Sequence, residues 1–423
     1  MKPTIAALWF LLAGIAAAPA FAACEPGAYG DGRGDAVVLA PNPRIPAPDL
    51  RYMFLDGRIG STADNDPLVA CVDGGVRVGG AAGAVWRALP FTRTDTAFTS
   101  VGTRLVGRLI EPAGNDPQRP LVVMVHGSER TSPLNSAYAY ALAAQGIAVF
   151  VYDKRGTGGS AGEYTQNFEL LAADAAAALT HARELARGRF ARSGFFGGSQ
   201  GGWVAPLAAT RTPADFVAVG FGLVASPIEE DREQMISEAR ALHLDPGATA
   251  LINQLSAATA RLLLSDFHDG YRDLARVRQR IAGQPWAHDI HGEYSGEMLW
   301  LDESELRRLG AARFDNVELI WDYDAVAVLQ RLDTPLLWVL AEQDREAPIE
   351  TTRRALTGLI RAGKPVDLYL FPDTDHGMFE FVQNPDGSRT STRITDGYLR
   401  LLADWIRADA HGAYGRAQRL SGE

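Results

Sequence analysis

The stretch of sequence that decides the fold reads Ser193-Gly194-Phe195-Phe196-Gly197-Gly198-Ser199-Gln200-Gly201-Gly202-Trp203. Its first five residues predict a short buried strand, and residues 203–209 predict a helix. Between them, residues 197–201 match the pattern Gly-x-Ser-x-Gly. A serine on such a sharp strand-to-helix turn has a strained backbone, and the residues two positions to either side must be small. The context therefore predicts a nucleophile at Ser199, with a glycine-rich turn of no chemical role as the simpler alternative.

A second match to the same pattern lies at residues 158–162. The strand expected before it ends at Tyr152, and the residues after it are polar, so Ser160 is expected to be a loop residue. The stretch also imitates the dinucleotide-binding pattern Gly-x-Gly-x-x-Ala, but it neither opens a helix nor lies in the first turn of a sheet. We therefore expect no cofactor.

Apolar stretches alternate with helical ones from Thr103 onward, which is typical of a parallel sheet covered by helices. Helices are expected at 137–144 and 174–186. Strands are expected at 103–110, 120–125, 147–152, 193–197, 216–223, 335–341 and 366–371.

Two other regions break this alternation. Residues 25–95 hold many Gly, Pro and Asp residues and short alternating stretches, which predict a small β-rich region. Residues 228–320 hold helical stretches without a clear strand and predict a helical insertion. The expected organisation is a signal peptide (1–22), an N-terminal β-rich region (23–95), a first core segment (96–227), a helical cap insertion (228–321) and a second core segment (322–423).

A serine hydroxyl needs a general base, which is in turn oriented by an acid. His376 follows the expected strand 366–371, at the edge where a parallel sheet presents functional groups. Asp344 follows the strand 335–341 and is the expected acid. The alternatives for the acid are Glu342, Asp322, Asp324, Asp373 and Asp375.

An acyl-transfer site also needs hydrogen-bond donors for the developing oxyanion. The backbone N–H of Gln200, directly after the nucleophile, is one expected donor. The backbone N–H of Ser128, in the loop that ends the strand 120–125, is the other. His126, two residues earlier, is expected to turn away and bond to the loop.

These motifs together resemble the α/β-hydrolase superfamily of serine hydrolases, and most of all exported bacterial members related to dienelactone hydrolases, cinnamoyl-type esterases and serine aminopeptidases. The resemblance covers residues 97–225 and 322–407. The residues that carry it are Val125-His126-Gly127-Ser128, the 152–160 loop with Asp153 and Arg155, the Gly197–Gly201 turn, Asp344 and Asp375-His376-Gly377. It implies an α/β-hydrolase fold with a Ser199, Asp344 and His376 triad. Glu129 departs from it, because many relatives carry glycine there.

The expected activity is hydrolysis of carboxylic esters, because an ester leaving group demands least of the site. An aminopeptidase, or another amide or thioester hydrolase of the same fold, is the enzymatic alternative. An aminopeptidase would need acidic cap residues to hold a substrate ammonium, such as Glu229, Glu230, Asp231 or Glu297. An inactive hydrolase fold that serves as an exported binding protein is the alternative outside enzymes. The cap aromatics Trp286, Tyr294, Trp300 and Trp321 would either line the substrate pocket or pack the cap.

Composition limits the partners. The chain has 423 residues, 47% of them hydrophobic, which is enough for a sizeable core. Its net charge of −10 and the absence of a basic run argue against nucleic-acid binding. The expected partner is a small ester or a short peptide-like substrate, and the oligomeric state is left open.

The N-terminus predicts export. Lys2 precedes an apolar run from Ile5 to Ala18, and Ala20-Phe21-Ala22 fits a signal-peptide cleavage site; a membrane anchor is the alternative. The mature protein is therefore expected in the periplasm or outside the cell, without stable membrane insertion. The only cysteines, Cys24 and Cys71, are expected to form a disulfide there, with lipidation of Cys24 or two free thiols as alternatives.

Overall fold

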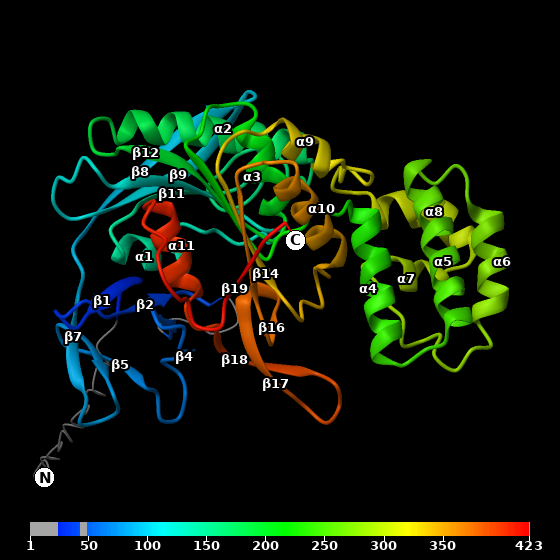
Figure 1. Ribbon diagram of the computed structural model, residues 1–423, viewed down its shortest axis with the longest axis horizontal. Helices are drawn as coiled ribbons and strands as arrows, with labels where there is room; N and C mark the ends of the chain where they lie inside the picture. The colour runs from blue at the N-terminus through cyan, green and yellow to red at the C-terminus, as the bar shows by residue number, and fades with distance from the viewer. Residues whose placement is uncertain (1–23, 43–48, 423) are drawn as a thin grey trace, which may run out of the picture.

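The computed structural model describes residues 24–42 and 49–422, so the predicted signal peptide lies outside the described residues. Figure 1 shows three parts: a core with a large sheet between two layers of helices, a β-rich region near the N-terminus, and a group of helices that projects from one side of the core. No helix of the described residues is long and apolar enough to cross a membrane.

The core is built on a nine-stranded sheet with the order β19-β15-β14-β13-β12-β10-β11-β9-β8. Its strands are β8 (Phe91–Ser100), β9 (Thr103–Pro112), β10 (Pro120–Val125), β11 (Ala148–Tyr152), β12 (Arg192–Gly198), β13 (Phe216–Gly220), β14 (Leu336–Ala341), β15 (Val366–Phe371) and β19 (Gln418–Leu420). The six strands from β15 to β11 are parallel, and β8, β9 and β19 add antiparallel edges. The predicted mostly parallel sheet is thus confirmed.

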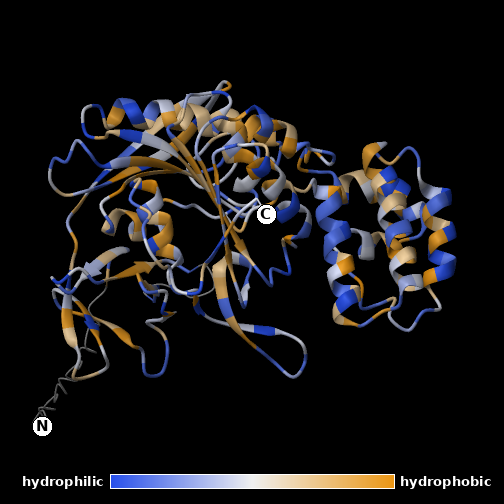
Figure 2. Ribbon diagram, in the orientation of Figure 1, coloured by the Kyte–Doolittle hydropathy of each residue, from blue (hydrophilic) through white to orange (hydrophobic). Residues whose placement is uncertain are grey.

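Helices cover both faces of this sheet (Figure 1). One layer holds α1 (Ala137–Ala144) and α11 (Tyr398–Ile406), and the other holds α2 (Phe168–Leu185), α3 (Gly201–Ala209), α9 (Ala325–Arg331) and α10 (Glu350–Arg361). The central strands β10, β11, β13 and β14 correspondingly consist mainly of hydrophobic residues (Figure 2). Helix α2 begins six residues before the predicted 174, because the Asn167 side chain accepts a hydrogen bond from Leu170 N and caps it.

The N-terminal region forms its own seven-stranded antiparallel sheet. Its strands are β1 (Gly27–Gly30), β2 (Ala36–Ala40), β3 (Arg51–Phe54), β4 (Ile59–Ser61), β5 (Val69–Val72), β6 (Gly75–Val78) and β7 (Ala84–Ala88). A disulfide joins Cys24 to Cys71 on β5. The predicted boundary at residue 95 falls within β8, which pairs with β9 along its whole length and so belongs to the core.

The helical insertion consists of α4 (Pro227–Ala241), α5 (Pro246–Leu264), α6 (Tyr271–Ile281), α7 (Ser295–Trp300) and α8 (Glu303–Phe314). It encloses a hydrophobic core of its own, separate from those of the sheet. The buried Asp231 ties α4 to the loop before α7, because one of its oxygens accepts hydrogen bonds from Tyr294 N (2.9 Å) and Ser295 N (3.0 Å). Figure 1 shows α4 next to the core and α5, α6 and α8 farther away.

The insertion therefore packs mainly on itself. Trp286 and Tyr294 are buried in its core, Trp321 packs against that core, and the exposed Trp300 stacks on His288 at 4.1 Å between ring centroids. The sequence left two roles for these aromatic residues, lining the substrate pocket or packing the insertion. In the structure they pack the insertion.

A small antiparallel sheet that the sequence did not indicate follows β15. It consists of β16 (Thr374–Asp375), β17 (Phe379–Gln383) and β18 (Arg389–Ile394), with a short 3₁₀ helix, η1 (His376–Met378), between the first two. His376 thus lies at the base of a long hairpin.

Candidate active site

Ser199 occupies a strained turn between β12 and α3. Its φ of 51° lies in the left-handed region, which non-glycine residues rarely adopt. A Cβ atom on Gly197 would come within 2.5 Å of Gly201 O, and one on Gly201 would come within 2.9 Å of Val125 O. Both flanking glycines are therefore required by close backbone contact, as predicted for this turn.

His376 and Asp344 meet although 32 residues separate them. Asp344 follows β14 and His376 follows the neighbouring β15, so both lie at the carboxyl edge of the sheet with Ser199. His376 Nδ1 lies 2.9 Å from one Asp344 carboxylate oxygen and 3.1 Å from the other. The Asp344 side chain is buried, and it also accepts a hydrogen bond from Ala347 N at 2.7 Å. The carboxylate is thereby fixed in place under the imidazole.

The other candidate acids have different partners. Asp324 caps α9, Glu342 accepts a hydrogen bond from Asp373 N, and Asp373 forms an ion pair with Arg416. Asp375 pairs with Arg389 and accepts hydrogen bonds from the backbone N–H groups of Arg345 and His376. Within the described chain, the hydrogen bonds and ion pairs of the His376 ring involve Asp344 and Glu346 and not Asp322.

Phe221 places His376 beside the serine turn. Its ring lies edge-on to the imidazole, with 5.1 Å between centroids, and also packs against Gly198. His376 Nε2, the nitrogen not bonded to Asp344, lies 3.6 Å from Glu346 Oε2. Within the described chain, Ser199 Oγ forms no hydrogen bond with this nitrogen, so the proton-transfer contact is not made in this state.

The pKa of His376 reflects these neighbours. Burial lowers the pKa, but the hydrogen bond to Asp344 and the charges of Asp344, Glu346 and Asp375 outweigh it, and the pKa lies above its ordinary value. Burial also raises the pKa of Asp344, against the opposing effect of His376.

The two predicted oxyanion donors lie at the same edge. Gln200 is the N-cap of α3 and follows Ser199, and Ser128 follows β10, the strand next to β12. Gly127 lies against Ser199, since a Cβ on Gly127 would be 3.5 Å from Ser199 Cβ. Within the described residues, neither the Ser128 nor the Gln200 backbone N–H has a hydrogen-bond acceptor. Both amides are available to a ligand.

Three side chains hold the loop at residues 126–128. His126 turns away from the site and bonds to Tyr152 O, and burial lowers its pKa to about 3. Lys154 Nζ donates to Gly127 O at 2.6 Å, and Tyr164 Oη donates to Ser128 O at 2.6 Å. Sequence reasoning assigned no role to Lys154 or Tyr164. The motif that contains Lys154 was recognised, but nothing in it indicates contact with a loop 27 residues away.

Ser160, the serine of the second Gly-x-Ser-x-Gly match, has a structural role. Its Oγ donates to Asp153 O at 2.7 Å and accepts from Val106 N at 2.9 Å. It thus fixes its own loop to β9, as expected for a loop residue.

Carboxylates of the insertion lie next to this part of the core. Glu293, in the loop before α7, interacts electrostatically with His376 and with Glu346 of the core, and Glu230, at the start of α4, interacts with Glu293, Asp344 and Glu346. The pKa of Glu230 lies well above its ordinary value, mainly because of burial and, to a smaller extent, because of the charge of Glu293. Burial and the charges of Asp231 and Glu346 raise the pKa of Glu293, which His376 opposes. The site therefore has an acidic side.

The other acidic cap candidates have structural partners instead. Glu229 forms the capping box of α4 with Ser226, Asp231 binds the loop before α7, and Glu297 pairs with Arg313. Sequence reasoning named Glu230 but missed Glu293, which no local pattern marks.

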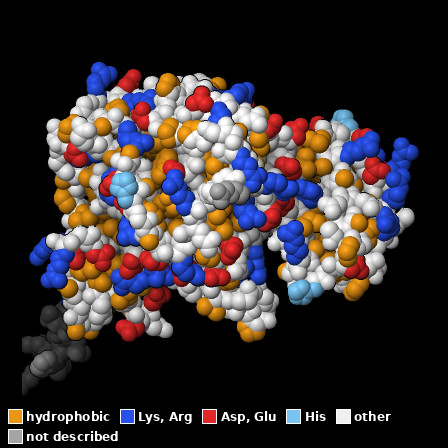
Figure 3. All heavy atoms as spheres, viewed as in Figure 1, with side chains coloured by type: hydrophobic (Ala, Val, Ile, Leu, Met, Phe, Trp, Pro, Cys, Tyr) orange, Lys and Arg blue, Asp and Glu red, His pale blue; other side chains and the backbone are white. Residues whose placement is uncertain are grey.

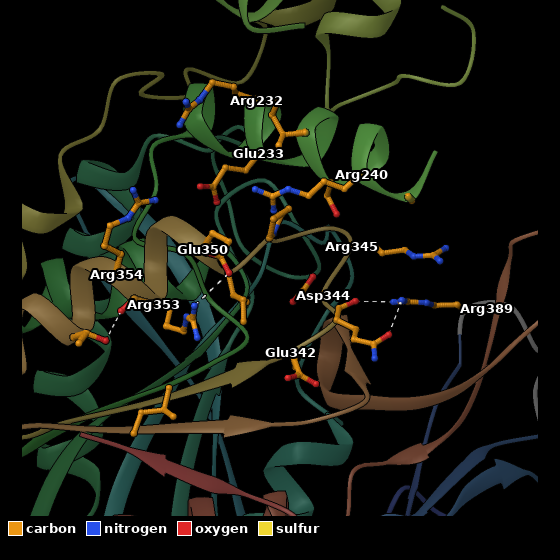
Figure 4. A pocket seen from close by; sticks show the side chains of 18 of the residues that line it. Arg232, Glu233, Arg240, Glu342, Asp344, Arg345, Glu350, Arg353, Arg354 and Arg389 are labelled. Carbon is orange, nitrogen blue, oxygen red and sulfur yellow. Dashed lines mark hydrogen bonds and ion pairs between the residues drawn. The ribbon is translucent and has the colours of Figure 1, made fainter. Parts of the chain in front are cut away.

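A cavity of about 1160 Å³ lies between α4 and α10. Eight arginines and four carboxylates line it. The described lining residues include Asp344, but they do not include Ser199 or His376. Figure 4 shows Arg232 and Arg240 on α4 across from Arg353 and Arg354 on α10. Figure 3 shows the same gathering of basic side chains along the boundary between core and insertion.

No group of three or more His, Cys, Asp or Glu residues in the described ranges is arranged to hold a metal ion.

Two family models match the chain, and each match contains part of the predicted site. Residues 116–289 match the serine aminopeptidase family S33, and residues 281–400 match the prolyl oligopeptidase family. The first match contains Ser128 and Ser199, and the second contains Asp344 and His376. The chain is an α/β hydrolase. The predicted superfamily is thus confirmed, and so is the predicted fold, including the N-terminal β-rich region.

Several solved structures are similar to this α/β hydrolase. An esterase from Pyrococcus furiosus aligns with 17% identity and a TM-score of 0.42, over 68% of this chain and 83% of its own. Est1E from Butyrivibrio proteoclasticus, solved with ferulic acid, aligns with 16% identity and a TM-score of 0.41, over 74% and 96%. A bacterial brefeldin A esterase aligns with 19% identity and a TM-score of 0.42, over 68% and 70%. No curated protein matches the chain in sequence.

Proposed function

We propose that this α/β hydrolase cleaves carboxylic esters by acyl transfer through Ser199, His376 and Asp344. The observation that carries the proposal is the pair of hydrogen-bond distances from His376 Nδ1 to the buried Asp344 carboxylate, beside a serine with a strained backbone. This arrangement leaves Nε2 as the nitrogen that can take a proton from Ser199.

In the first step, Ser199 Oγ attacks the ester carbonyl carbon as His376 Nε2 takes the hydroxyl proton. Asp344 holds the ring and stabilises the imidazolium that forms. The tetrahedral oxyanion accepts hydrogen bonds from the Ser128 and Gln200 amides, and collapse of the intermediate releases the alcohol with the proton from His376. Water then attacks the acyl-enzyme by the same route and releases the acid.

An aminopeptidase is the second candidate, and the acidic side of the site supports it. Glu230, Glu293 and Glu346 would hold a substrate ammonium close to His376, where their mutual repulsion would be relieved by a positive charge. The family matches to aminopeptidases and oligopeptidases agree with this chemistry.

Labelling with a fluorophosphonate tests the nucleophile directly. The purified protein should form one covalent adduct, found by mass spectrometry on the peptide that contains Ser199, and Ser199→Ala should form none. A folded protein that stays unlabelled would contradict the proposal and favour a binding protein that lacks activity.

A substrate panel then separates the two enzymatic candidates. Short and long acyl esters should be hydrolysed faster than aminoacyl amides. Preference for amides with a free amino group, lost in Glu293→Gln, would instead identify an aminopeptidase.

We also propose that the protein acts outside the cytoplasm. The Cys24–Cys71 disulfide supports this, because disulfides persist mainly in oxidising compartments. Mass spectrometry of the exported protein should find its N-terminus at Ala23, and a full-length chain retained in the cytoplasm would contradict the proposal.

A further inference from the structure

Lys154 is buried beside the proposed oxyanion site. It is only 3% exposed, although lysine is seldom buried without a strong reason. Its ammonium donates a hydrogen bond of 2.6 Å to Gly127 O. The short distance is typical of a charge-assisted bond.

The peptide group that Lys154 contacts is the one that carries the Ser128 N–H. In a planar trans peptide, the C=O of one residue and the N–H of the next point in opposite directions. A donor that fixes Gly127 O on one side therefore aims Ser128 N–H to the other side. The positive charge of the ammonium that is hydrogen-bonded to this oxygen also polarises the peptide and makes that N–H a stronger donor.

We propose that Lys154 is a positioning residue of the hydrolytic site, which aims and polarises the Ser128 N–H toward the oxyanion by binding Gly127 O. The inference rests on the proposed function and adds a residue to it. Lys154 does not touch the substrate. Its contribution appears only as negative charge develops on the carbonyl oxygen, so it lowers the barrier to the chemical step rather than strengthening substrate binding.

The environment of Lys154 makes this role depend on pH. Burial lowers the pKa of its ammonium to about 8, with Glu129 opposing and Arg130 reinforcing the shift. The other groups that face it are His126, which is neutral because its own pKa is about 3, and the ring of Tyr164, whose centroid lies 5.2 Å from Nζ. As the pH rises through this value, Lys154 loses its charge and the polarisation of the peptide is lost with it.

Lys154→Met tests the proposal, because methionine keeps most of the side-chain volume and removes the charge. We expect kcat for an ester to fall roughly 10- to 100-fold with little change in KM, since one oxyanion donor is weakened and misaligned. The matched control is Lys364→Met, the other lysine of the described chain, which pairs with Asp333 and should leave kcat unchanged. Thermal unfolding of both variants verifies that they are folded.

The pH profile supplies a readout that a purely structural lysine would not move. In the wild type, kcat should fall as the pH rises through about 8, and this alkaline limb should be absent in Lys154→Met. Glu129→Gln should shift the limb to lower pH, because the Glu129 charge raises the pKa of Lys154. A wild-type limb that persists in Lys154→Met would overturn the proposal.

The pKa itself can be measured without a substitution at Lys154. The chain has only three lysines, Lys2, Lys154 and Lys364, so protein grown on lysine labelled with ¹³C at Cε gives few resonances to assign. The Lys154 resonance should titrate near pH 8. A Lys154 resonance that titrates at the ordinary lysine value would overturn the pH dependence.

The two proposals fail in different ways. If the wild type neither hydrolyses esters or amides nor reacts with fluorophosphonate at Ser199, the proposed function fails. If the wild type is active through Ser199 and Lys154→Met retains its kcat, only the role of Lys154 fails.

Discussion

The charges of Asp344, Glu346 and Asp375 act on the His376 imidazole. Asp344 binds Nδ1 directly, whereas Glu346 lies 3.6 Å from Nε2, the nitrogen that receives the serine proton in the proposed mechanism. All three charges raise the pKa of the ring. At the scale of single residues, the site therefore combines a base that is stabilised in its protonated form with a surface carboxylate that competes for the same nitrogen.

The charges around His376 should determine the acidic limb of the profile of kcat/KM against pH. A base must be neutral to take a proton, so kcat/KM should rise with pH through the pKa of His376, at a value above the ordinary 6.5. Glu346→Gln removes one charge that raises this pKa, so its limb should lie at lower pH than that of the wild type. Glu350→Gln, a substitution of another exposed glutamate nearby on α10, is the control and should leave the limb in place. If the acidic limbs of Glu346→Gln and the wild type coincide, the Glu346 charge does not raise the pKa of His376 and the prediction is contradicted.

At the scale of elements, the junction of β12 and α3 determines where Ser199 lies. The strand and the helix approach so closely that Gly197 and Gly201 have no room for side chains. The positive φ of Ser199 is sustained by this packing and by the bond from Ser199 N to Gly220 O, at 3.2 Å, on the adjacent β13. Backbone strain at the candidate nucleophile is thus maintained by two neighbouring strands and a helix.

A methyl group at Gly197 tests this junction. Gly197→Ala places a Cβ 2.5 Å from Gly201 O, so it should lower the free energy of unfolding by about 2–3 kcal/mol and abolish labelling of Ser199. Gly358→Ala, within α10, is the control: apart from its chain neighbours and the backbone of its own helix, no atom lies within 4 Å of its Cβ position, and alanine should stabilise the helix by up to about 1 kcal/mol. Urea unfolding measures both changes. Equal effects at the two positions would show that close packing at the turn is not the cause.

At the scale of the whole molecule, the three parts contribute differently to the site. The core supplies Ser199, Asp344, His376 and Ser128. The insertion contributes Glu230 and Glu293 from the side that faces the core, and Glu233 on α4 binds Thr351 N at 3.1 Å at the start of α10. The N-terminal sheet contributes none of the predicted catalytic or oxyanion residues; it has a small hydrophobic cluster and a disulfide of its own, and Ala28, Val38 and Met53 also pack against the core.

Removal of the disulfide should therefore affect stability and leave catalysis intact. The bond joins residues 47 apart, so Cys24→Ser with Cys71→Ser should lower the stability of the N-terminal sheet by about 2–4 kcal/mol. Hydrogen exchange should accelerate in β1 to β7 and stay slow in the core sheet. The kcat for an ester should stay within about twofold of the wild type, because the disulfide contacts none of the predicted catalytic residues. A large loss of kcat would show that this sheet supports the site.

The sequence by itself determined the parts of this protein whose signals are local. The central strands appear as apolar runs in the sequence, and the Ser199 turn appears as five consecutive residues, because strand burial and steric crowding act over a few positions. The neighbouring strand ends that carry Asp344 and His376 could be predicted because a parallel sheet collects its carboxyl edges on one side.

Only the tertiary structure decided which distant side chains meet there. The Lys154 contact with Gly127 O, the approach of Glu293 to His376 and that of Glu230 to Asp344 all join segments that are far apart in the chain. Buried lysines and clustered carboxylates look like ordinary solvated residues in a sequence. Their energetics depend on desolvation and on the charges nearby, and both are fixed only when the chain has folded.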